Sequence, residues 1–68
     1  MSRVEVGEYE LVDEAGVWFL EMDGRIQATL IDMGGGTWRV RSPEGSVETV
    51  TVPPGTAHPA RYVAEQVT

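Results

Sequence analysis

The sequence lacks cysteine and has a single histidine, His58, among its 68 residues. Without cysteine the chain can form neither a disulfide nor a thiolate metal site, and one histidine cannot supply a multi-histidine metal centre. The spacing of the acidic residues defines no carboxylate pair, and no nucleophile stands near His58. We therefore expect no cofactor and no metal, and we predict that the protein is not an enzyme.

Long apolar runs are missing too, as are lysine and asparagine. No segment approaches the length of a membrane span, and the first residues lack the pattern of a signal peptide. We therefore expect a cytoplasmic protein with no membrane and no small-molecule partner. Lysine and asparagine have A-rich codons, so their absence indicates a high-GC genome and favours a small actinobacterial or actinophage protein as the source.

The acidic residues are concentrated in the first half of the chain. The formal net charge is −6, with eight acids against two arginines in residues 1–36 and three acids against three arginines in residues 37–68. An acidic half repels the phosphate backbone of nucleic acids and suits a basic protein surface. The other interpretation is that the charge serves solubility alone.

The second half contains the clearest hairpin. Residues 37–41 and 47–52 alternate apolar and polar side chains, which is the period of a half-buried strand. Between them Pro43 presets its own φ and Gly45 can take a positive φ. This pattern predicts two strands joined by a type I turn with a glycine bulge.

The first half predicts a second hairpin. Residues 17–22 and 25–33 flank Asp23–Gly24, the kind of dipeptide that most strongly indicates a type I′ turn. Residues 8–12 also alternate and predict a further strand. Residues 1–7 either fray or add a short edge strand.

After the last strand the period changes to that of a helix. Residues 56–67 predict a short helix, capped either by Thr56 or by His58. Its apolar stripe comprises Ala60, Val63, Ala64 and Val67. The two tryptophans, Trp18 and Trp38, are expected in the core. We predict one α+β domain over residues 1–68, an antiparallel β-meander of four to five strands with two consecutive hairpins and one C-terminal helix packed on the sheet.

The strand predicted at residues 17–22 has apolar side chains on both faces. This pattern indicates either a central position in the sheet or a face that is left for a partner. We predict that a partner protein binds Val17, Phe19, Glu21 and Ile31. The alternative, nucleic-acid-binding pair is Arg39 and Arg41, two residues apart on one strand. The other interpretation of these arginines is that they pair across the strands with Glu48 or are simply solvated.

Residues 35–41 read Gly-Gly-Thr-Trp-Arg-Val-Arg, and Pro43-Glu44-Gly45, another strand and an alanine-rich helix follow. Over residues 26–67 this order resembles the arm-type N-terminal DNA-binding domain of phage-type tyrosine integrases. The resemblance implies a three-stranded sheet on one helix, with Arg39 and Arg41 facing the major groove. Such domains are usually basic through the turn and third strand, whereas this chain has Glu44 and Glu48 there.

The favoured hypothesis is a small non-catalytic phage or mobile-element accessory protein that binds a host protein. One alternative is DNA binding, which requires Arg39 and Arg41 to form one patch with Arg25 or Arg61, away from the acids. Two others are an acidic DNA mimic and a structural homo-oligomer, such as a homodimer sealed through an edge strand.

Overall fold

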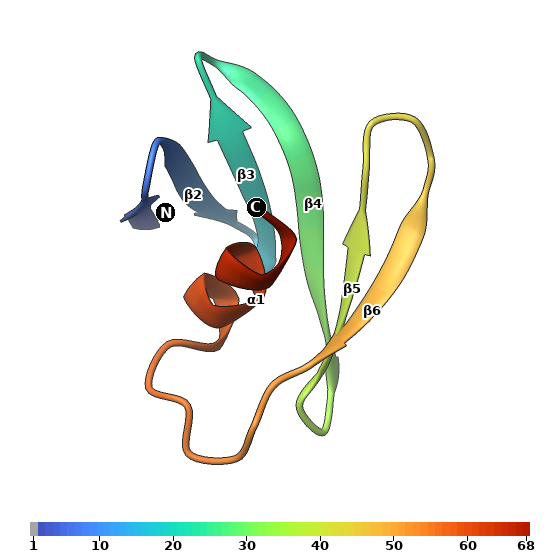
Figure 1. The fold of residues 1–68 in the computed structure, drawn as a ribbon. Helices are drawn as coiled ribbons and strands as arrows, with labels where there is room; N and C mark the ends of the chain where they lie inside the picture. Colours follow the sequence, from blue (N-terminus) through green and yellow to red (C-terminus); the bar gives the residue numbers. More distant parts are fainter. Residues whose placement is uncertain (1) are drawn as a thin grey trace.

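The protein is an antiparallel sheet with one helix packed on one of its faces (Figure 1). The computed structural model describes residues 2–68, and within them six strands lie side by side in sequence order. The elements are β1 Ser2–Val6, β2 Tyr9–Glu14, β3 Val17–Met22, β4 Arg25–Gly34, β5 Thr37–Arg41, β6 Val47–Thr51 and α1 Pro59–Val67. No helix in this range is long and apolar enough to cross a membrane.

The predicted α+β meander with a C-terminal helix is confirmed, but over residues 2–68 it has six strands rather than four to five. The additional strand is β1, which pairs with β2 from Ser2 to Val6. Val6 is buried in the core, and this burial explains why the segment is a strand rather than a frayed end. Met1 lies outside the described residues.

The turn between β3 and β4 has the predicted type I′ geometry. Asp23 and Gly24 both have positive φ, 53° and 75°. This turn twists in the same sense as the strands it joins, and so fixes the pairing of Met22 with Arg25. The same two-residue geometry joins β2 to β3, where the first turn residue is Ala15, with a φ of 53°.

The turn between β5 and β6 also follows its prediction. The amide of Gly45 donates to the carbonyl of Ser42 at 3.0 Å, and the amide of Ser42 donates to the carbonyl of Ser46 at 2.9 Å. Gly45 has a φ of 96°, which an L side chain rarely adopts. These contacts are those of a type I turn closed by a glycine bulge.

The core lies between α1 and the sheet face beneath it. Cross-strand rows of apolar side chains build this face, with Leu11 opposite Leu20 and Leu30 opposite both Trp18 and Val40. The buried members of the core are Val6, Leu11, Leu20, Ala28, Leu30, Trp38, Val40, Val52, Ala60, Val63 and Ala64. The helix contributes its predicted apolar stripe, with Val67 partly buried at its end. Trp38 is buried as expected, whereas Trp18 is half-buried.

The helix begins at Pro59, and His58 is its N-cap. The Nδ1 atom of His58 accepts a hydrogen bond from the Arg61 amide at 3.4 Å. Thr56, the other candidate cap, instead donates its hydroxyl to a carbonyl of the preceding loop at 2.6 Å. The His58 ring also meets the Trp18 ring edge to face, with centroids 5.9 Å apart. His58 therefore has a structural role at the point where the helix docks.

Ala15 offers a test of the turn between β2 and β3, because its φ of 53° lies in the left-handed region that strains an L side chain. Ala15→Asn should raise the free energy of unfolding by about 0.5–1 kcal/mol in urea denaturation, since asparagine tolerates this conformation. Ala15→Val should lower it, because a β-branched side chain tolerates it least. Equal stability of the three proteins would show that the turn is not held in this geometry.

Candidate functional site

The sheet face opposite α1 is covered by no other element of residues 2–68, and we call it the open face (Figure 1). Successive side chains of a strand point to opposite faces, so the neighbours of the core residues lie here. The register of the strands arranges these side chains as an apolar centre, a row of glutamates across β1 to β3 and a pair of arginines along β5.

The centre of the open face is apolar. Val17 on β3 lies directly opposite Ile31 on β4, and Phe19 lies between Val12 on β2 and Thr29 on β4. Val17, Phe19 and Ile31 are half-buried. Val12 is only 4% exposed, although it does not belong to the core beneath the helix. The structure therefore brings the three predicted apolar residues together in one patch, and Val12 joins them.

A row of glutamates borders this patch. Glu5 on β1, Glu10 on β2 and Glu21 on β3 are direct cross-strand partners. Adjacent strands are about 4.8 Å apart, and like charges placed directly opposite one another destabilise a sheet. Arg3 forms an ion pair with Glu10, while Glu5 and Glu21 have no ion pair with any residue in 2–68. The structure thus extends the predicted Glu21 into a row of three carboxylates.

Arg39 and Arg41 lie on the other side of the patch. On β5, Arg39 is opposite Ile31 and Arg41 is opposite Thr29, and both side chains are exposed. Neither forms an ion pair within the described part of the chain. The expected pairing with Glu48 is wrong, because Glu48 is opposite Val40 and therefore lies on the helix side of the sheet.

The other arginines do not join this pair. Arg25 is opposite Met22, in a row that belongs to the helix side. Arg61 lies on α1, where it approaches Glu65 at 3.6 Å. Arg39 and Arg41 therefore form no larger basic patch with them, and they share the open face with the glutamate row.

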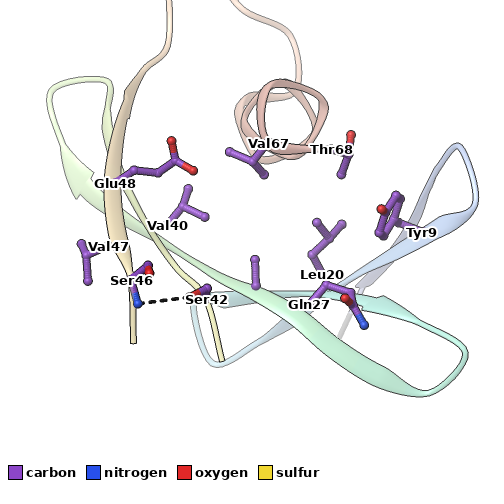
Figure 2. Close-up of a pocket in the computed structure, with 11 residues that line it drawn as sticks. Tyr9, Leu20, Gln27, Val40, Ser42, Ser46, Val47, Glu48, Val67 and Thr68 are labelled. Carbon is purple, nitrogen blue, oxygen red and sulfur yellow. Dashed lines mark hydrogen bonds between the residues drawn. The ribbon is translucent and has the colours of Figure 1, made fainter. Parts of the chain in front are cut away.

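The helix side contains a cavity of about 380 Å³ beside the end of α1. Figure 2 shows Leu20 and Val40 on the sheet that forms its floor and Val67 on the helix above them. Glu48, on β6, lies at one side, and Tyr9 lies at the other. Glu48 is the only carboxylate side chain among the residues that line it. The other lining side chains are apolar groups, hydroxyls and the Gln27 amide, so no second carboxylate side chain and no imidazole lines the cavity beside Glu48. Across residues 2–68, no group of three or more potential ligands could hold a metal ion.

Comparisons with models of known protein families, with curated proteins and with solved structures found no match to this chain. Most of the geometry of the open face depends on strand register, which brings glutamates from three strands into one row. The position of Val12 could have been found from the alternation of side chains along the strand. Val12 follows the core residue Leu11 and so points to the other face.

The glutamate row leads to a stability prediction. Glu21→Thr removes one of the opposed carboxylates and introduces a β-branched residue, so it should raise the free energy of unfolding by about 0.5–1 kcal/mol at low salt. The gain should shrink at about 1 M NaCl, where charges are screened. The measurement is urea denaturation at both salt concentrations.

The matched control is Glu44→Thr, which makes the same change at an exposed position in the β5–β6 turn. It should leave the stability almost unchanged, because no glutamate is its cross-strand partner. If the Glu21 variant shows no greater gain than this control, the carboxylates of the row do not repel one another.

Proposed function

We propose that this chain is a small non-catalytic binding protein that contacts a partner protein through its open face. The observation that carries this proposal is an uncovered apolar patch, Val17, Phe19 and Ile31, bordered by a row of opposed glutamates. The opposed glutamates cost stability in the isolated chain, and the apolar patch is left in contact with water. Such features are typical of a surface that is retained for binding.

The patch and the row together define the chemistry of the partner. Phe19 lies at the centre of the face, and a large aromatic side chain in that position is the usual anchor of an interface. The surface that receives it would be apolar. Beside that surface, arginine or lysine side chains would face Glu5 and Glu21, where they relieve the repulsion between the carboxylates.

A protein partner fits this face better than a nucleic acid does. Binding to nucleic acid strengthens with the number of phosphates that are neutralised. Three arginines lie beside the patch, but Arg3 is paired with Glu10, which leaves Arg39 and Arg41 without an ion pair to any residue in 2–68. A duplex laid across the face would bring its phosphates close to the glutamate row. We therefore assign the two arginines to carboxylates on the partner protein.

The composition of the chain favours a phage or mobile element as its source, and the partner is then a protein of the host. Binding through a flat face would act by occlusion, because the open face would cover a surface that the host protein needs for another contact. No catalytic group is required for this mode of action.

Phe19→Lys should abolish capture of the partner from a lysate of the host. The substitution removes the apolar anchor and places a positive charge where basic groups of the partner would approach. Phe19 is half-buried and lies outside the core, so the variant should stay folded by circular dichroism. The matched control is Gln66→Lys, which adds the same charge to the exposed surface of α1 and should capture the partner as the parent chain does.

Two outcomes would contradict the proposal. Unfolding of the Phe19 variant would show that this side chain supports the core rather than an interface. Equal capture by both variants would show that the open face is not the binding surface. A protein that binds a generic DNA duplex at low salt, and loses this ability with Arg39→Ala, would favour the nucleic-acid alternative instead.

A further inference from the structure

The edge strand β6, Val47–Thr51, lacks the features that usually prevent a sheet edge from pairing with another strand. Its sequence, Val-Glu-Thr-Val-Thr, contains no proline and no basic residue, and the ladder with β5 shows no bulge. Its one charge, Glu48, lies on the helix side rather than along the edge. Natural sheets usually protect their edges with prolines, charged side chains or β-bulges, because an exposed edge pairs with other strands.

The hydrogen bonding of the β5–β6 ladder shows which backbone groups are free. The amide of Val52 donates to the carbonyl of Gly36 at 2.7 Å, just beyond the last ladder pair. Bonded and non-bonded pairs alternate in an antiparallel ladder, so Val50 and Glu48 direct their amides and carbonyls toward β5. The alternate residues of the strand direct their amides and carbonyls outward, at the free edge. These are Val47, Thr49 and Thr51.

We propose that a second copy of this chain adds to this edge, antiparallel to β6, about a two-fold axis at Thr49. Thr49 then exchanges both backbone hydrogen bonds with Thr49 of the second copy, and Val47 does so with Thr51 of the second copy. Every outward group of β6 is satisfied in this register. The interface is the same on both copies, so it closes as a dimer and leaves no free β6 edge.

The side chains fit this register. Glu48 comes opposite Val50 of the second copy, so no like charges face each other across the join. On the open face Thr49 meets Thr49 of the second copy, and Thr51 meets Val47, and both are favourable cross-strand pairs of β-branched residues. A register one pair toward the start of β6 would place Glu48 opposite Glu48 of the second copy. A register one pair toward its end would place Val47 opposite Pro53 of the second copy, which has no amide to donate. Charge and hydrogen bonding together therefore select the axis at Thr49.

The charge distribution favours a second copy as the occupant. Residues 37–68, which include β6, have as many arginines as acids, whereas residues 1–36 carry the whole net charge of −6. Joining at β6 brings the two neutral halves together and leaves the acidic halves at the far ends. The other edge, β1, lies in the acidic half. A chain of 68 residues, with its small core, also gains stability from such pairing.

Thr49→Pro tests this pairing, because it removes an outward amide without removing a hydrogen bond to β5. By sedimentation equilibrium from about 10 μM to about 1 mM, the parent chain should rise from 7.4 kDa toward twice that mass. The variant should stay at 7.4 kDa while its circular dichroism spectrum remains that of the parent. Glu5→Pro, at the other free edge, is the matched control and should associate as the parent does.

Thr49→Glu provides a second test in case the proline variant does not fold. A glutamate at this position stands opposite Arg39 in the monomer, where it is favourable, and opposite its own copy in the dimer, where it is not. It should therefore be a folded monomer at low salt. The proposal is overturned if the parent stays at 7.4 kDa throughout, if it forms species larger than a dimer, or if both Thr49 variants still associate. These results do not depend on the proposed role of the open face.

Discussion

The structure depends on the burial of one face of the sheet beneath a single short helix. Leu11, Leu20 and Leu30 on the sheet and Val63 on the helix are shielded from water completely or almost completely. A helix of nine residues would be marginal in water by itself, and an open sheet of this size needs a second layer. Each element therefore stabilises the other. Because the chain contains only enough helix to cover one side, the other side of the sheet stays uncovered.

The parts of the fold that could be predicted are those determined by neighbouring residues. Asp23–Gly24 specifies its turn by dihedral preference alone, and Pro43 with Gly45 does the same for the last hairpin. The apolar stripe of the helix, which ends at Val67, could be predicted from the helical spacing of its residues. Val17, Phe19 and Ile31 were predicted to share a surface, and strand alternation with a tight turn places them on the same face. The sheet has six strands rather than four to five, because the pattern of residues 1–7 allowed either a frayed end or an edge strand, and the tertiary burial of Val6 decides for the strand.

The glutamate row could not be predicted, because it depends on the register of three strands. Glu5, Glu10 and Glu21 lie on three successive strands and become direct neighbours only once β1, β2 and β3 pair in this register. The expected partnership of Glu48 with the arginines failed for a different reason. Glu48 is in phase with Val50 on β6, and once Val50 packs toward the core, Glu48 must lie on that side too. Charge complementarity suggested that pair, whereas the two-residue period of the strand decided against it.

The central claim is that the open face is the part of this molecule that other proteins contact. The most direct test replaces Phe19 with a photoreactive benzoyl derivative of phenylalanine and irradiates the protein in the cells that naturally produce it. The structure predicts a covalent adduct with another protein from this position, and none when the same group replaces Gln66 on the exposed side of α1. Absence of an adduct at Phe19, or equal adducts from both positions, would contradict the claim.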